Sequence, residues 1–282
     1  MKIIKKAKEI FKRLWKILTR PDMLILPGQL AFFLLLAIVP MFTLIIYGVS
    51  LFHVSFDFIS NLITKAFGSE ITNLIIPMIE DIHIGPEFLW PLCVAFYAAS
   101  AGAGSIIICS NKLFHFENSD FLKRKIKGLI MTFILVSLVV FLLLIPAFGN
   151  KVIELLQFVN MNEGFTNFIA FIINMMKGPA SWLLIFMLIK ILYTMAPDQS
   201  IPSSYTTKGS LFTTFGFVIS TGIYSFYVNN MAHYDILYGG LSHFVVLMIW
   251  FYIIAYMVTI GIAINSEELK KMEKIGTINN EN

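Results

Sequence analysis

The sequence has little charge and almost no cysteine. Only 13% of its 282 residues are Asp, Glu, Lys or Arg, whereas a soluble globular chain carries roughly 25%. Hydrophobic residues make up 57%, and they include 27 phenylalanines. A soluble chain of this size needs a polar surface, and a surface that faces lipid does not. The composition therefore argues against a soluble domain and predicts an integral membrane protein.

The two cysteines, Cys93 and Cys109, lie in one apolar stretch. On a helix they would be roughly 24 Å apart at about 1.5 Å per residue, too far for a disulfide, so we expect both to be reduced and structural. The histidines are scattered without metal-ligand spacing. They are His53, His83, His115, His233 and His243. We therefore expect neither a metal nor another cofactor.

Motifs for catalysis and for nucleic-acid binding are also missing. The sequence contains no GxxxxGK[ST] loop for a nucleotide and no GxSxG elbow. A zinc-dependent ribonuclease would need clustered His and Asp, and a nucleic-acid-binding protein would need a soluble basic face. We therefore predict that the protein is not an enzyme and has no nucleic-acid partner, and that its partners are membrane lipids.

Apolar stretches of spanning length occur six times, since a membrane helix needs about 20 mostly apolar residues. They lie near residues 24–52, 88–110, 126–148, 179–196, 210–228 and 239–265. This pattern predicts an all-α membrane protein with a six-transmembrane-helix bundle. Two further stretches, 56–84 and 152–176, are apolar but interrupted by charged or amide side chains. We expect external amphipathic helices here, with 56–84 as an amphipathic segment and 152–176 as a hairpin near the interface. If either stretch spans the membrane, the topology changes.

The positions of Lys and Arg predict the orientation, because cytoplasmic loops are enriched in them. With the N-terminus inside, 17 of the 21 fall on the cytoplasmic side and three outside, and Lys190 lies within a span. We expect a multi-pass protein of the bacterial plasma membrane with both termini cytoplasmic.

Three regions follow from this arrangement. Residues 1–22 form a basic amphipathic segment, either an interfacial helix on the anionic inner leaflet or a solvated basic cap that sets topology. Residues 23–266 form the six-helix membrane domain. Residues 267–282 form a cytoplasmic polar tail.

A series of short motifs recurs in a fixed order between about residues 27 and 266. Order and spacing together resemble the YihY/BrkB family of bacterial inner-membrane proteins, once widely mislabelled as ribonuclease BN. The matching positions are Leu30, Ala31, Pro40, Tyr193, Pro197, Gly209, Tyr227, Tyr238, Gly239, Trp250, Gly261 and Asn265.

The resemblance implies a six-helix bundle, with suggested roles in resistance to host serum and, for some relatives, in transport of envelope lipids. This chain departs from the family at three positions. Phe32 replaces the usual tyrosine and Ala37 the usual serine. Ala263 stands where the family commonly has a glutamate, so a coupling role for that carboxylate would require Glu267 to substitute for it.

Four residues are candidates for a substrate path: Gln29, Pro40, Lys190 and His243. A lysine within a span costs at least about 2.5–3.5 kcal/mol, and Lys190 either meets an anionic headgroup or extends to the interface. Pro40 removes a helical hydrogen bond and frees a carbonyl, which marks either a substrate path or a packing kink. Gln29 and His243 are polar groups near span ends.

The run from Ala98 to Ser105 contains almost only small residues. Small residues let membrane helices approach closely, so we expect the tightest helix contact here. The alternatives are a wall of a narrow cavity or a seam for a homo-oligomer.

Two function hypotheses remain open. The first is a transporter or flippase of envelope lipids or other amphiphiles. It is supported by the resemblance and by spans that contain kinks and polar residues. The second is a non-transporting membrane scaffold in envelope assembly, supported by the scarcity of ionisable groups inside the spans.

Overall fold

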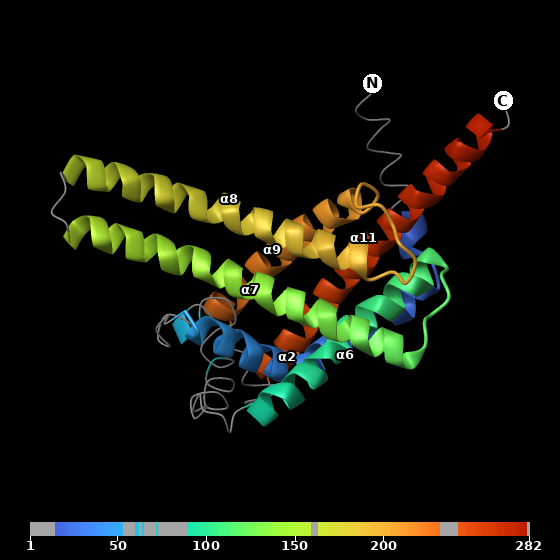
Figure 1. Ribbon diagram of the computed structural model, residues 1–282, viewed down its shortest axis with the longest axis horizontal. Coiled ribbons are helices and arrows are strands. Elements are labelled where there is room, and N and C mark those ends of the chain that lie inside the picture. Colours follow the sequence, from blue (N-terminus) through green and yellow to red (C-terminus); the bar gives the residue numbers. More distant parts are fainter. Residues whose placement is uncertain are drawn as a thin grey trace.

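The computed structural model describes residues 15–52, 60–61, 64, 72, 89–158, 163–231 and 242–280. These ranges contain six long helices and no strand (Figure 1). The helices are α2 (Asp22–Ser50), α6 (Leu89–Phe114), α7 (Phe121–Phe158), α8 (Glu163–Met195), α9 (Thr207–Met231) and α11 (Ser242–Asn280). Each contains a stretch long and apolar enough to cross a membrane. The predicted all-α membrane bundle is confirmed.

The helices α7 and α8 are longer than the sequence predicted. They have 38 and 33 residues, or roughly 57 Å and 50 Å at about 1.5 Å per residue, against a hydrocarbon core of ~30 Å. They pack on each other and run past the other helices (Figure 1). The stretch 152–176, predicted to be an external hairpin near the interface, is the end of α7 and the start of α8. It therefore continues two spanning helices, and its position relative to the membrane stays a prediction. A helix satisfies its backbone hydrogen bonds internally, so polar side chains do not end it.

Two other predicted segments lie largely outside the described residues. Of the stretch 56–84, only isolated positions are described, and its interfacial placement stays a prediction. The N-terminal segment is described from Trp15 onward. There Ile17 is buried in the main hydrophobic core, whereas Trp15 is 60% exposed. The last turns of this segment therefore pack against the bundle.

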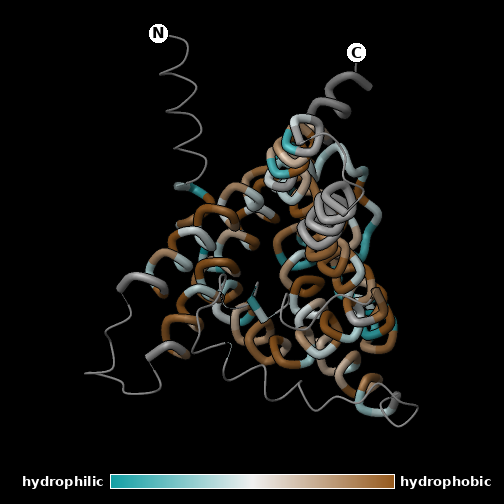
Figure 2. Tube along the Cα trace, turned by 90° about the vertical axis from the view of Figure 1, so that its left-hand side faces the viewer, coloured by the Kyte–Doolittle hydropathy of each residue, from teal (hydrophilic) through white to brown (hydrophobic). Residues whose placement is uncertain are grey.

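The interior of the bundle consists of two apolar clusters. One contains Met23, Leu30 and Ile107, and the other contains Val49, Tyr224 and Trp250. Hydrophobic residues recur along most of the described helices (Figure 2). Large apolar side chains stay exposed along the spans, including Ile223, which is 65% exposed. A surface of this kind is stable only against acyl chains.

The small-residue run of α6 lies where three helices meet. A Cβ added at Gly102 would lie 3.3 Å from Ala37 Cβ on α2, and one added at Gly128 on α7 would lie 3.3 Å from the Ser100 carbonyl oxygen. Such short separations are the close backbone approach that small residues permit. The run therefore forms a close contact within the chain but not the tightest one, because a Cβ added at Gly209 on α9 would lie nearer still to α11. A homo-oligomer through the same run stays a prediction.

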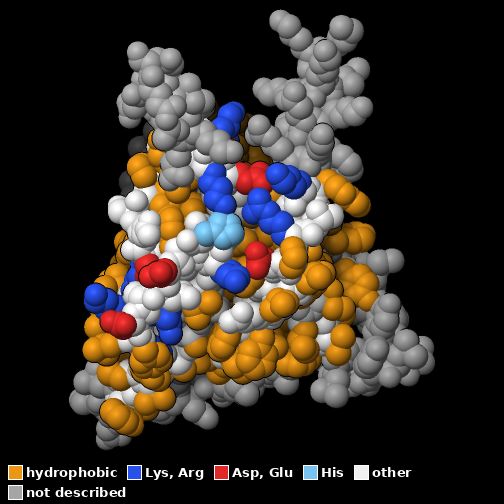
Figure 3. Space-filling view, turned by 90° about the vertical axis from the view of Figure 1, so that its right-hand side faces the viewer, with side chains coloured by type: hydrophobic (Ala, Val, Ile, Leu, Met, Phe, Trp, Pro, Cys, Tyr) orange, Lys and Arg blue, Asp and Glu red, His pale blue; other side chains and the backbone are white. Residues whose placement is uncertain are grey.

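Charged side chains gather at one end of the bundle (Figure 3). Successive long helices alternate in direction, so α2, α7 and α9 begin at the end where α6, α8 and α11 finish. We call this the basic end. Its described basic residues are Lys16, Arg20, Lys112, Lys123, Arg124, Lys125, Lys127, Lys208, Lys270 and Lys271.

The two cysteines are expected to differ in reactivity. Cys93 is exposed near the start of α6, whereas Cys109 is buried. N-ethylmaleimide should add one label to the detergent-purified chain, at Cys93, because the reagent cannot reach Cys109. Intact-protein mass spectrometry measures the labelling, and Cys93→Ser should remove it. A label on Cys109 in the folded protein would contradict the described packing.

Candidate functional site

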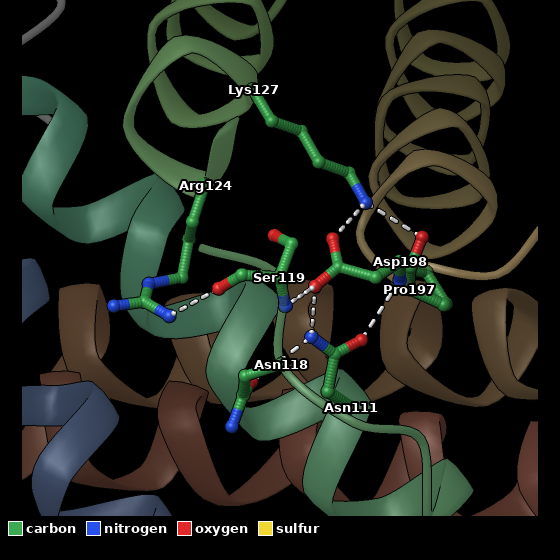
Figure 4. Close-up of polar contacts among 7 residues, drawn as sticks. All are labelled: Asn111, Asn118, Ser119, Arg124, Lys127, Pro197 and Asp198. Carbon is green, nitrogen blue, oxygen red and sulfur yellow. Dashed lines mark hydrogen bonds and ion pairs between the residues drawn. The ribbon is translucent and has the colours of Figure 1, made fainter. Parts of the chain in front are cut away.

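A polar network around Asp198 joins three helices at the basic end (Figure 4). Asp198 follows the end of α8, and its Oδ1 lies 2.9 Å from Lys127 Nζ in the second turn of α7. Its Oδ2 accepts hydrogen bonds from Asn111 Nδ2 at 2.6 Å and from the Ser119 N–H at 2.9 Å. One carboxylate therefore connects α6, the loop that follows it, and α7.

Asn111 and Lys127 also hold the main chain beside Asp198. The Asp198 N–H donates to Asn111 Oδ1 at 2.8 Å, and Lys127 Nζ donates to the Pro197 carbonyl oxygen at 2.6 Å. Asn111 is completely buried, and its Nδ2 also donates to Asn118 Oδ1 at 3.0 Å. The turn after α8 is therefore fixed by backbone as well as by side-chain contacts.

The environment of Asp198 keeps it ionised. Burial raises the pKa of its carboxyl, but hydrogen bonds from the Ser119 N–H, Lys127 and Asn111 outweigh burial and lower the pKa to about 2. The side chain of Asp198 is 13% exposed and that of Lys127 24%. Asp198 is therefore charged at every physiological pH, and its contact with Lys127 connects α7 with the turn after α8.

Two further ion pairs connect elements to the end of α11. Arg20 Nη2 lies 2.5 Å from Glu267 Oε1, and Lys208 Nζ lies 2.5 Å from Glu268 Oε1. Glu267 is the residue that the sequence offered as a substitute for the family's glutamate. It pairs with Arg20 at the basic end, whereas Ala263 itself is fully buried.

The helices α9 and α11 cross at two glycines. A Cβ added at Gly209 would lie 2.0 Å from the Gly261 carbonyl oxygen and 2.4 Å from Asn265 Oδ1. The Gly209 N–H donates to that same Asn265 oxygen at 2.7 Å. Gly209 therefore has no room for any side chain, and its amide, one of the free donors at the start of a helix, is satisfied by α11.

A tyrosine from α8 completes this crossing. The Tyr193 hydroxyl donates to the Val258 carbonyl oxygen at 2.9 Å and shares a 2.7 Å hydrogen bond with Thr213. A Cβ added at Gly261 would lie 2.5 Å from that hydroxyl. Four motif positions, Tyr193, Gly209, Gly261 and Asn265, therefore meet at one contact between α8, α9 and α11.

The other described motif positions have packing roles. Leu30 and Ala31 belong to the main core cluster, and Trp250 to the second cluster, against which Tyr227 packs. Pro197 adjoins Asp198 in the polar network. Tyr238 and Gly239 lie outside the described residues.

The four predicted path residues do not come together. Gln29 is exposed on α2, and Pro40 is partly buried within α2, which stays helical through it. Lys190 is partly buried on α8, with its Nζ 5.9 Å from the centre of the Phe186 ring. The side chain of His243 lies outside the described residues. A substrate path through these four residues stays a prediction.

Three cavities have walls that include residues of α2, α6 and α7. The largest has a volume of about 470 Å³ at the end opposite the basic end, and its walls include Tyr47, Cys93 and Phe133. A cavity of about 210 Å³ lies nearer the middle, beside Ala37 and Trp250. All three are mainly apolar.

The third cavity, which we call the α6–α7 groove, has a volume of about 220 Å³. Its walls come from the middle of α6, the start of α7 and one residue of α2. They are Phe33, Ser100, Ala101, Gly104, Ser105, Ile108, Phe121, Arg124 and Lys125. This groove lies nearest the basic end, because Phe121, Arg124 and Lys125 are in the first turns of α7.

The fold and its lipid-facing surface define a polytopic α-helical membrane protein. The family model described as virulence factor BrkB matches residues 14–280, and the chain belongs to this family.

Two curated relatives show the same similarity. The chain is 26% identical to the ribonuclease-like protein YfkH of Bacillus subtilis (strain 168) over 244 residues, which are 85% of this chain and 87% of the relative. It is 28% identical over 91 residues to a UPF0761 membrane protein of Psychromonas ingrahamii, covering 32% of this chain and 31% of the relative. No solved structure matches the chain. The described residues include no group of three or more His, Cys, Asp or Glu side chains that fits a metal ion.

Sequence analysis did not single out Asp198, Asn111 or Lys127. The available signal was positional, since all three lie beside span ends that the topology brings to the same side of the membrane. Asn111 was a second signal, because an amide side chain does not fit a purely apolar helix end. Buried polar groups need partners, and a search for partners among the neighbouring span ends would have reached Asp198.

Proposed function

We propose that this protein moves envelope lipids or other amphiphiles through the bacterial plasma membrane, as a transporter or flippase. The observation that carries the proposal is the presence of three mainly apolar cavities against α6, of which the one away from the basic end has a volume of about 470 Å³. Interiors of proteins are normally close-packed. A cavity of about 470 Å³ with apolar walls has the size and chemistry of a ligand site, and an acyl chain fits that chemistry.

The proposed orientation places the basic end in the cytoplasm. Among the described residues, most Lys and Arg lie at that end, and Lys151, Lys177 and Lys190 lie away from it on α7 and α8. Cytoplasmic ends of membrane proteins carry the excess of these residues. The largest cavity then lies in the outer half of the membrane and the α6–α7 groove in the inner half. A lipid that moves between leaflets would meet the two in turn.

The test fills the largest cavity without changing its charge. Cys93 is exposed and forms part of the cavity wall, so Cys93→Trp places a large ring in the cavity, and Cys93→Ser is the matched control. Vesicles with purified protein and a fluorescent phospholipid are treated with an impermeant quencher. We expect wild type and Cys93→Ser to expose inner-leaflet lipid, and Cys93→Trp to do so about tenfold more slowly, or about 1.4 kcal/mol in the barrier.

Each outcome has a clear meaning. Equal rates for wild type and protein-free vesicles would contradict transport and favour the scaffold in envelope assembly. Equal rates for wild type and Cys93→Trp would contradict the assignment of the path to this cavity. Lys190→Ala, measured in parallel, tests whether the lysine on α8 contributes to the same movement.

A further inference from the structure

The α6–α7 groove combines positive charge with an apolar floor. Arg124 and Lys125 lie on one side of it, and Phe33, Ala101 and Ile108 contribute apolar surface. The space exists because the α6 residues in its wall are small. A Cβ added at Gly104 would meet nothing within 4 Å.

The two cations have no acidic partner among the described residues. Lys125 Nζ donates to Ser100 Oγ at 2.7 Å and to the Tyr97 carbonyl oxygen at 3.1 Å, and lies 3.5 Å from the centre of the Tyr97 ring. Arg124 Nη1 donates to the Ser119 carbonyl oxygen at 3.1 Å. The ion pairs in the described part of the chain instead involve Arg20, Lys127 and Lys208.

Both cations retain unused hydrogen-bond donors. An ammonium group has three donors and a guanidinium has five, whereas the contacts above use two of Lys125 and one of Arg124. Each side chain is partly buried. Two adjacent positive charges in a mainly apolar groove repel each other, and an anion between them would remove that cost.

Depth in the membrane identifies the kind of anion. The helix α7 begins at Phe121, and its uninterrupted apolar stretch follows the basic residues of its first two turns. Arg124 and Lys125 therefore lie just before that apolar stretch. That is the level of the headgroups, where Lys and Arg side chains meet lipid phosphates. Phe33 and Ala101 in the groove's wall lie farther along α2 and α6 from the basic end than Ile108 does. An acyl chain below the phosphate would therefore run against Phe33 and Ala101.

We propose that the α6–α7 groove binds one anionic phospholipid, with its phosphate between Arg124 and Lys125 and an acyl chain against Phe33 and Ala101. A guanidinium matches two phosphate oxygens at once, and the positive start of α7 favours the same charge. A zwitterionic headgroup would add its own positive charge to the two that the groove already contains. The inference deepens the proposed function, on which it rests, by naming the class of lipid that enters at the basic end.

Native mass spectrometry of the full chain in detergent tests the site. The protein is titrated with phosphatidylglycerol or with phosphatidylcholine. We expect wild type to retain phosphatidylglycerol at least about tenfold more tightly than phosphatidylcholine. The double variant Arg124→Gln/Lys125→Gln should lose that preference. The double variant Lys112→Gln/Lys123→Gln removes the same charge from exposed positions outside the groove and should keep it.

A steric variant separates the groove from general attraction to positive charge. Gly104→Phe fills open space in the groove and leaves every charge in place, so it should weaken phosphatidylglycerol binding as much as the double groove variant. Arg124→Lys/Lys125→Arg keeps both charges and should retain binding, which guards against misreading a folding defect.

Several results would overturn the inference. They are equal binding by the groove and control variants, unchanged binding in Gly104→Phe, equal affinity for the two lipids, and displacement of the lipid by inorganic phosphate alone, which would indicate a site for the free ion. The assay does not depend on transport. A lipid that binds in this groove but never changes leaflet would refute the proposed function and leave the site intact.

Discussion

Gly209→Ala is expected to destabilise the bundle by about 3 kcal/mol or more, because its methyl group would lie 2.0 Å from the Gly261 carbonyl oxygen. That oxygen belongs to the main chain of α11 and cannot rotate away. Relief requires α9 and α11 to separate, which also stretches the 2.7 Å hydrogen bond from the Gly209 N–H to Asn265. Overpacking here therefore costs a buried polar contact as well as steric strain.

Gly222→Ala is the matched control on the same helix. A Cβ added there meets nothing within 4 Å, and alanine in a helix is favoured over glycine by about 1 kcal/mol. Thermal unfolding of detergent-purified protein, followed by size-exclusion chromatography, measures both variants. Gly209→Ala should lose its monodisperse peak at a much lower temperature than wild type, and Gly222→Ala should match or exceed wild type. Equal stability of the two variants would refute the close crossing.

Asp198→Asn is expected to cost about 2 kcal/mol of stability near neutral pH. The fall in the carboxyl pKa from 3.8 to about 2 corresponds to that much folding free energy. The new asparagine turns either its oxygen or its positively polarised NH₂ group toward Lys127, so the lysine loses its counter-charge. The Asn111 and Ser119 donors then keep at most one full acceptor. Removing one partner of a shielded pair is costly.

The depressed pKa of Asp198 also determines how the effect of Asp198→Asn on stability changes with pH. The folded-state pKa of Asp198 is depressed, so its contribution is present above the unfolded pKa and is lost as pH falls toward about 2. The stability difference between wild type and Asp198→Asn should stay constant between about pH 5 and about pH 8 and shrink below about pH 4. Chemical unfolding in detergent at several pH values measures it.

Glu268→Gln provides the comparison for an exposed pair. Its partner Lys208 is 64% exposed, and exposed ion pairs contribute little, typically below about 1 kcal/mol. A loss in Glu268→Gln as large as that in Asp198→Asn would show that net charge at the basic end matters and not the geometry of the Asp198 network.

The sequence predicted the spans well because the length of an apolar stretch is enough to identify a span. The predicted first span, 24–52, nearly coincides with the observed Asp22–Val49, and the fifth, 210–228, with Thr207–Val228. The stretch 152–176 was predicted from its amide and acidic side chains to be an external hairpin, and these side chains did not reveal that it continues α7 and α8. Backbone hydrogen bonding within a helix continues whether its side chains face lipid or water, so polarity cannot mark where α7 ends.

The candidate site was less accessible to sequence reasoning. The order of Gly209, Gly261 and Asn265 along the chain was visible, but their meeting at one crossing depends on how α9 and α11 pack. The α6–α7 groove escaped notice for a related reason. Arg124 and Lys125 lie in a basic run that topology explains, and the absence of acidic partners, which distinguishes them from Lys127, is a property of three-dimensional packing.

The long pair α7 and α8 has a mechanical property that follows from its two ends. The chain joins the helices at one end through residues 159–162, and the Lys127–Asp198 pair joins them at the other. Two rods fastened at both ends resist sliding past each other and tilt as a single stiff beam. We therefore expect a force on the projecting ends of α7 and α8 to be transmitted to the turn at Asp198. There α6 is also held, through Asn111.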